Sequence, residues 1–214
     1  MTDTRDRLAE AAARHVAFDG MNAKALRAGA RDIGLSEDVA TAFFPNGGTD
    51  LAAWIHRQGD ARLADWMEDA PKGRISDRIG NAIRQRLAFA DPELVRAASA
   101  VLALPQNQAL AAQLLWGTAD TIWTGLGDSS RDVNWYSKRA TLSAVYAASV
   151  LYWLGDHSDN HRDTADFVDR RIAGVMQFEK MKASARKLPG VAILTDRATG
   201  WIQAPKSAGT EKKP

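Results

Sequence analysis

The segment from Asn134 to Lys180 carries the longest helical pattern of the chain and predicts two consecutive helices. The first begins at Asn134, whose side chain can accept a hydrogen bond from the first turn, and ends near Leu154. Apolar residues fall on every face of this helix, a pattern typical of a protein core. Its apolar run of about fifteen residues is shorter than the roughly eighteen that a membrane span needs, so we predict a core helix.

The second helix of this pair begins at Asp163 or Thr164 and is amphipathic. Its apolar row consists of Val168, Ile172, Val175 and Met176. Asp166 and Arg170 form a pair four residues apart on the polar side. This pattern predicts one face that packs against the core and one face in solvent.

Helical periodicity also runs through the rest of the chain, and no segment shows the alternation that marks a strand. Glycine, proline, asparagine and serine separate the helical segments. The predicted helices upstream of Asn134 span about 4–18, 25–33, 37–44, 49–67, 75–87, 92–104 and 106–126. The sequence therefore predicts an all-α protein with about nine helices.

The first 48 residues show the spacing of a helix-turn-helix unit, with a helix that ends at Gly20 and two short helices separated by Gly34. Ser36 opens the third helix, and Phe43-Phe44-Pro45 closes it. These features resemble the amino-terminal domain of the TetR repressors. The resemblance implies a TetR-like helix-turn-helix unit at 1–48, a larger helical ligand-binding domain at 49–187 and a C-terminal tail at 188–214.

The helix in the recognition position argues against DNA binding. A recognition helix needs cations or amides to contact phosphates and base edges. Glu37 and Asp38 occupy its first turn, and no lysine or arginine follows before Phe44. Arg27 and Arg31 supply too little positive charge to reverse the repulsion of a polyanion. We therefore expect no nucleic-acid partner.

A second resemblance rests on an ordered series of motifs between about Val95 and Arg186. The series consists of Leu104-Pro105-Gln106-Asn107, Asp120 with Trp123, Gly127-Asp128, Asp132-Val133-Asn134-Trp135-Tyr136-Ser137-Lys138-Arg139, Asp169-Arg170-Arg171-Ile172, Val175-Met176 and Phe178-Glu179-Lys180. These motifs resemble the Coq-nine family, whose members are lipid-binding accessory proteins of ubiquinone biosynthesis. The sequence departs from the family pattern at Ser137, where Thr is usual, and at Ala165, where Trp is usual.

This resemblance implies a non-catalytic protein that takes a polyprenylated quinone precursor from the membrane and presents it to a hydroxylase of the ubiquinone pathway. It implies an isoprenoid or phospholipid ligand and peripheral contact with the inner membrane from the bacterial cytoplasm. The TetR resemblance implies a homodimer through the last two long helices. The alternative hypothesis is a ligand-responsive transcriptional regulator of the TetR type.

Large rings are frequent in the predicted helices 106–126 and 134–154, and an aromatic lining is typical of a ligand cavity. The predicted lipid-binding residues are Trp116, Trp123, Leu142, Tyr146, Val150 and Trp153. A pocket of this kind suits an isoprenoid, because each buried CH₂ contributes roughly 0.8 kcal/mol. Ordinary core packing of the same rings would produce the same pattern.

Two adjacent rings at the start of the helix 134–154 have the composition of an interface. Trp135 and Tyr136 are surrounded by charged and polar residues, so we expect them to be exposed. In the Coq-nine family this motif belongs to the surface that meets the hydroxylase. The resemblance therefore implies a partner-binding site at Asp132, Asn134, Trp135 and Tyr136. The alternative is a helix end packed against the preceding loop.

The amino-acid composition limits which kinds of chemistry and which partners the protein can have. The chain has no cysteine, which excludes disulfides and thiolate catalysis and favours a reducing compartment. Its net charge of +2 permits an anionic partner but does not require one. No leader precedes the first helix, so we expect no secretion or organelle signal.

We expect Arg74, Arg78, Arg84 and Arg86 on the solvated outer face of their helix, or in contact with lipid head groups.

No nucleophile with an adjacent base and no dinucleotide-binding loop is evident, so we expect neither an enzyme nor a cofactor. His157 and His161 lie among aspartates, but in a polar loop that lacks the glutamate of a zinc helix motif. We therefore expect no metal. The tail from Leu188 mixes apolar and basic residues, and we expect it to touch the membrane before a disordered end after Ala204.

Overall fold

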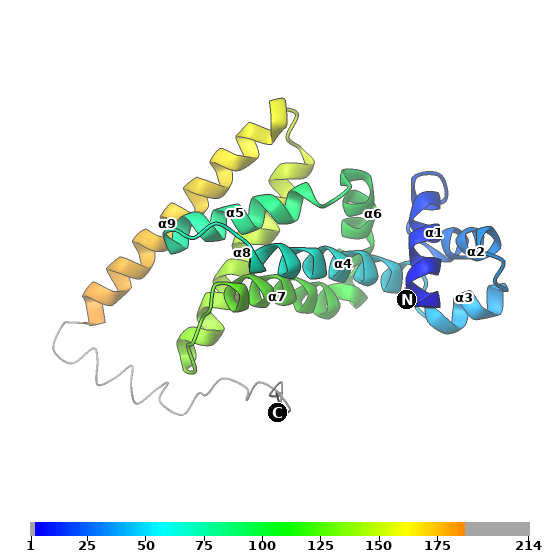
Figure 1. The fold of residues 1–214 in the computed structure, drawn as a ribbon, viewed down its shortest axis with the longest axis horizontal. Helices are drawn as coiled ribbons and strands as arrows, with labels where there is room; N and C mark the ends of the chain where they lie inside the picture. The colour runs from blue at the N-terminus through cyan, green and yellow to red at the C-terminus, as the bar shows by residue number, and fades with distance from the viewer. Residues whose placement is uncertain (1–2, 187–214) are drawn as a thin grey trace.

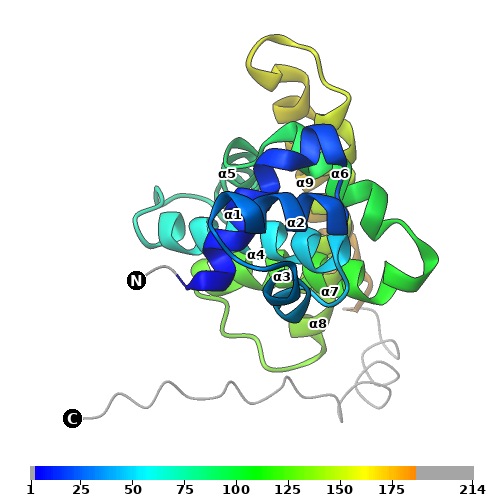
Figure 2. The same cartoon turned by 90° about the vertical axis from the view of Figure 1, so that its right-hand side faces the viewer.

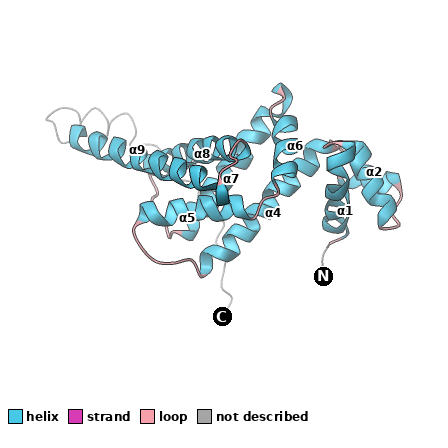
Figure 3. Ribbon diagram, turned by 90° about the horizontal axis from the view of Figure 1, so that it is seen from above, coloured by secondary structure: helices cyan, strands magenta, loops and turns pink. Residues whose placement is uncertain are grey.

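The computed structural model describes residues 3–186, and these residues form helices and connecting loops without a strand (Figures 1 and 3). The helices are α1 (Thr4–Asp19), α2 (Ala23–Asp32), α3 (Glu37–Phe43), α4 (Gly48–Glu68), α5 (Ile75–Ala88), α6 (Pro92–Leu102), η1 (Pro105–Asn107), α7 (Gln108–Gly125), α8 (Val133–Leu154), η2 (Asp159–His161) and α9 (Arg162–Arg186). The all-α prediction is confirmed.

The first three helices form a compact unit at one end of the molecule, seen end-on in Figure 2. Its core contains Leu8, Val16, Leu26 and Phe44, and it continues into α4 through Leu51. Helices α1 and α2 pack very closely. Gly29 permits this approach, because a β-carbon there would lie 2.4 Å from the backbone nitrogen of Ala12.

The larger part of the chain folds into helices α4 to α9 around a second core. Helix α7 packs against both α4 and α8, while α9 packs against α5 and α8 (Figure 1). Residues buried in this core include Leu63, Ile83, Ile122, Tyr146 and Val168. Helix α8 therefore lies in the middle of the domain, as its apolar pattern predicts.

Helix α8 nevertheless differs from the prediction of burial on every face. Leu151 is 69% exposed and Tyr152 is 38% exposed, so that expectation is wrong for one side of the helix. The start of α8 also differs, because Asp132 is the capping residue and accepts a hydrogen bond from the Asn134 backbone N–H at 3.0 Å. The predicted cap at Asn134 instead lies inside the first turn.

Two further expectations from helical pattern are wrong. Apolar periodicity predicts Phe18 on the packing side of α1, but its side chain is 91% exposed. Arg86 was placed on the solvated face of α5, but it is only 4% exposed. The carboxylate of Asp60 on α4 compensates the buried guanidinium, and the sequence pattern of α5 alone contains no sign of that partner.

Several helix ends shift by one or two residues from their predicted positions. Asn22 caps α2, and α4 begins at Gly48, one residue before its predicted start. The turn η1 separates α6 from α7 at Pro105, so α7 begins later than predicted. Within residues 3–186, no helix combines the length and apolar character needed to cross a membrane. The predicted membrane-touching tail lies outside the described residues.

Candidate functional site

A pocket of about 710 Å³ lies between the N-terminal unit and the larger helical domain. Helices α4, α6, α7 and α8 supply most of its wall, and α1 and α5 complete it. The apolar lining includes Ile55, Leu94, Val95, Ala98, Leu102, Leu115, Tyr146 and Val150. Exposed charged residues at the rim are Glu10, Arg14, Arg62 and Asp91. The site thus combines an apolar interior with a polar rim, as ligand pockets commonly do.

A buried polar cluster forms part of the wall where α4, α5 and α7 meet. Arg86 Nε donates a hydrogen bond to Asp60 Oδ1 at 2.8 Å, and Arg86 Nη2 donates to the backbone oxygen of His56 at 2.8 Å. Thr118 Oγ1 donates to Asp60 Oδ1 at 2.8 Å. Gly59 makes room for the guanidinium, because a β-carbon there would lie 2.3 Å from Arg86 Cζ.

Burial keeps the two ring residues of this cluster uncharged. Desolvation lowers the pKa of His56, and the nearby Asp60 carboxylate offsets that effect only in part. Desolvation also raises the pKa of Tyr146 to about 12. The single charges of Asp60 and Arg86 cancel each other. The polar part of the pocket wall therefore has no net charge near neutral pH.

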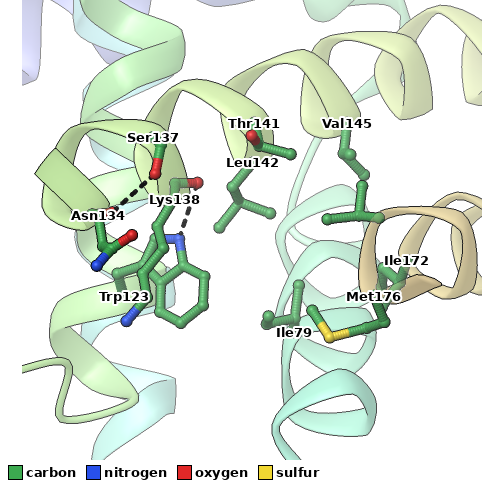
Figure 4. Close-up of a pocket in the computed structure, with 11 residues that line it drawn as sticks. Ile79, Trp123, Asn134, Ser137, Lys138, Thr141, Leu142, Val145, Ile172 and Met176 are labelled. Carbon is green, nitrogen blue, oxygen red and sulfur yellow. Dashed lines mark hydrogen bonds between the residues drawn. The ribbon is translucent and has the colours of Figure 1, made fainter. Parts of the chain in front are cut away.

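A second, smaller pocket of about 240 Å³ lies on the other side of α8, against α5 and α9 (Figure 4). Its apolar lining includes Ile79, Trp123, Leu142, Val145, Ile172, Val175 and Met176. Asn134, Ser137, Lys138 and Thr141 form its polar side. Trp123 Nε1 donates a hydrogen bond to the Lys138 backbone oxygen at 3.2 Å, which joins α7 to the first turns of α8.

The structure distributes the six predicted lipid-binding residues among four environments. Tyr146 and Val150 line the large pocket. Trp123 and Leu142 line the small one. Trp116 lies in neither lining and instead contacts the rings at the start of α8. Trp153 is buried near the ring of His161. Sequence periodicity predicted the two helices, α7 and α8, that carry these residues, but it could not assign their faces to separate pockets.

The four predicted partner-binding residues lie together at the start of α8. Tyr136 is 36% exposed, as expected, but Trp135 is half-buried, so the expectation of exposure is wrong for Trp135. Their rings contact each other at a centroid distance of 4.8 Å, and both lie near Trp116 of α7. Asp132 Oδ2 accepts a hydrogen bond from Asn134 Nδ2 at 2.8 Å. Trp135 and Tyr136 therefore form an aromatic patch together with Trp116 of α7. The sequence predicts only the two rings on α8.

Buried charges beneath this patch hold the loop 127–131 against α8. Asp128 accepts hydrogen bonds from Lys138 Nζ at 2.7 Å and from Arg139 Nη1 at 3.1 Å. The Arg139 guanidinium lies 4.0 Å from the centre of the Trp135 ring. The sequence predicts these residues only as parts of the family motifs, because Asp128 lies in the loop between α7 and α8 and shares no helical face with Lys138 and Arg139.

Polar groups elsewhere have structural partners. Glu37 forms ion pairs with Arg31 at 3.2 Å and Arg27 at 3.8 Å, so it draws both arginines toward an acidic helix start. Hydrogen bonds from Ser158 and Thr164 hold the pKa of Asp156 far below its usual value. Within the described residues, no group of three or more potential ligands could hold a metal ion.

The helix-turn-helix unit, the helical domain and its pocket define the TetR-like class of folds. A TetR transcriptional regulator from Nitrosomonas europaea matches with a TM-score of 0.62 and 18% sequence identity, over 79% of this chain and 95% of that one. At this identity the likeness concerns the fold alone. The predicted TetR-like architecture is confirmed.

The family follows from sequence. A COQ9 family profile matches residues 108–179. The ubiquinone biosynthesis protein COQ9 of Rattus norvegicus is 30% identical over 92% of this chain and 69% of its own length. COQ9 of Xenopus tropicalis is 30% identical over 93% and 68%, and that of Homo sapiens is 29% identical over 92% and 68%. All three relatives are described as mitochondrial. The chain belongs to the COQ9 family and has a role in ubiquinone biosynthesis.

Proposed function

We propose that this protein is a non-catalytic accessory protein that binds a polyprenylated quinone precursor and presents it to a hydroxylase of the ubiquinone pathway. The observation that carries the proposal is the large pocket, whose volume of about 710 Å³ falls in the range of small-molecule sites. Its lining is mainly apolar, and each buried CH₂ of an isoprenoid contributes roughly 0.8 kcal/mol. Family membership supports the pathway.

The protein acts at a membrane surface in this proposal, because its ligand resides in the bilayer. We place it in the bacterial cytoplasm, in peripheral contact with the inner membrane. The aromatic patch formed by the half-buried Trp116 and Trp135 and the exposed Tyr136 supports a docking site for the hydroxylase, since clustered rings are typical of interface hot spots. Ligand and partner would then both contact α8, the partner at its first turn and the ligand further along the helix.

Mass spectrometry of lipid extracted from the purified protein tests the ligand. Ser99 lines the large pocket on α6, while Ala100 beside it is exposed and outside the lining. Ser99→Trp should fill the cavity and reduce recovery of co-purified isoprenoid at least about tenfold, because the indole occupies space that the ligand needs. Ala100→Trp is the matched control and should leave recovery unchanged. Equal recovery from both folded variants would refute the pocket as the ligand site.

A transcriptional regulator is the competing function. The ion pairs of Glu37 with Arg27 and Arg31 count against it, because they occupy cations next to the helix that would approach DNA. A gel-shift experiment at low salt separates the two. Tight, sequence-selective binding to duplex DNA would favour the transcriptional regulator over the lipid-binding accessory protein.

A further inference from the structure

The buried cluster of the large pocket has hydrogen-bonding capacity that its own contacts do not use. Arginine has five N–H donors. The described hydrogen bonds of Arg86 use only Nε and Nη2, and its side chain lines the pocket while 95% buried. A hydrogen-bond acceptor on a ligand can therefore bind the remaining donors without displacing Asp60.

His56 contributes the complementary group. Thr118 Oγ1 donates its single hydrogen to Asp60 at 2.8 Å, so at 2.9 Å it accepts from His56 Nε2. A neutral imidazole with its proton on Nε2 has an acceptor at Nδ1. No described hydrogen bond uses Nδ1, and His56 lines the pocket. The wall thus offers one donor group on the buried side chain of Arg86 and one acceptor on His56, whose side chain is 16% exposed.

This combination selects among the head groups that an isoprenoid can carry. A bare hydrocarbon would leave the donor and the acceptor unsatisfied. A phosphate would bring negative charge against a cluster that has no net charge and would face the acceptor nitrogen of His56. A neutral hydroxyl can donate to His56 and accept from Arg86 at the same time.

We infer that the Asp60–Arg86–His56 cluster binds the phenolic hydroxyl of a neutral, prenylated ring, with the ring at the α4–α5–α7 wall and the isoprenoid chain along α6. The apolar residues Leu94, Val95, Ala98 and Leu102 form the α6 side of the pocket. The ring of Tyr146 lies edge-on to His56 at 6.3 Å and adds an aromatic surface at the head-group end. This inference rests on the proposed function and adds the orientation of the ligand and the residues that select its head group.

Competition for the protein from detergent micelles tests the inference with three ligands of equal prenyl chain length. These are a prenylated phenol, its methyl ether and a polyprenyl monophosphate. The wild-type protein should bind the phenol about tenfold more tightly than the methyl ether, because the ether cannot donate to His56 and leaves a buried acceptor unpaired. The monophosphate should also bind at least about tenfold more weakly than the phenol.

A double variant assigns the preference to the cluster. Asp60→Leu with Arg86→Met removes both charges together, so neither remains buried without its partner. It should retain binding of the methyl ether but lose the preference for the phenol. Arg84→Met with Asp169→Leu removes a 2.6 Å ion pair outside the pocket and should retain the preference.

The outcomes separate the two levels of the proposal. Equal binding of phenol and methyl ether by the wild-type protein overturns this inference but leaves isoprenoid binding intact. Tightest binding of the monophosphate also overturns it, and points to an anionic lipid. Failure of all three ligands to bind refutes the proposed function itself. The wild-type comparison decides these cases even where the double variant does not fold.

Discussion

Asp128 shows how single residues stabilise the region around the aromatic patch. Its side chain is 4% exposed and accepts hydrogen bonds from Lys138, Ser130 and Arg139. Burial alone would raise the pKa of Asp128, but these hydrogen bonds outweigh it and lower the pKa to about 2. The ionised carboxylate therefore fixes the loop 127–131 against α8.

We predict that Asp128→Asn lowers the free energy of unfolding by about 2 kcal/mol at pH 7, since a shift of one pKa unit corresponds to about 1.4 kcal/mol. The pKa of Asp128 lies below the ordinary value of 3.8, so its stabilisation is present above about pH 4 and disappears as the pH falls toward 2. Urea unfolding at several pH values measures this effect. Asp65→Asn, at an exposed site on α4, is the control. If the difference in free energy of unfolding between Asp128→Asn and the wild-type protein does not become smaller at low pH, the stabilisation does not come from the ionised Asp128 carboxylate.

Helix α8 connects the features of the site because its faces point to different surroundings. Tyr146 and Val150 contribute to the large pocket, whereas Leu142 and Val145 contribute to the small one. Its first turn carries the aromatic patch, and Arg139 anchors that turn to Asp120 at 2.6 Å. The patch is therefore held by charges beneath it as well as by its own rings.

We predict that Trp135→Ala with Tyr136→Ala weakens hydroxylase pull-down and ubiquinone production while lipid content stays nearly unchanged. The melting temperature should fall by only about 2–4 °C, because the lost cation–π contact with Arg139 contributes about 1 kcal/mol. Leu104→Ala removes an exposed apolar side chain elsewhere and should leave pull-down intact. A double variant that unfolds would show that the pair is structural.

At the scale of the whole molecule, several large apolar side chains remain uncovered on the last two long helices. Leu151 of α8 and Phe178 and Met181 of α9 are more than half exposed, with values of 69%, 58% and 59%. Exposed apolar surface of this kind is typical of an association site. The homodimer expected from the TetR resemblance stays a prediction.

Sedimentation analysis should therefore detect a dimer at micromolar concentration, and Phe178→Glu with Met181→Glu should convert it to a monomer, because a dimer would bury both charges. Phe18→Glu changes an even more exposed aromatic residue on α1, at the opposite end of the molecule, and should leave the dimer intact. A wild-type monomer well above micromolar concentration would contradict the prediction.

Local chemistry in the sequence determined the helices, their ends to within about two residues, and the family. Apolar periodicity predicts α5 from a row of four residues, Ile75, Ile79, Ile83 and Leu87, because successive helix turns place them on one face. The last three are buried, whereas Ile75 in the first turn is 45% exposed. Ser36 caps α3 as predicted, since its side chain accepts a hydrogen bond from a backbone N–H of the same turn. The ordered motifs of the second half predicted the COQ9 family, and sequence comparison confirms it over 92% of the chain.

Only the tertiary structure decided which side chains meet. Periodicity placed Arg86 in solvent because its partner, Asp60, lies 26 residues away on another helix. It likewise predicted Leu151 as buried, because an apolar pattern does not show whether a neighbouring helix covers that face. The large pocket combines residues from α1, α4, α5, α6, α7 and α8, so its lining depends on how helices pack across long sequence separations.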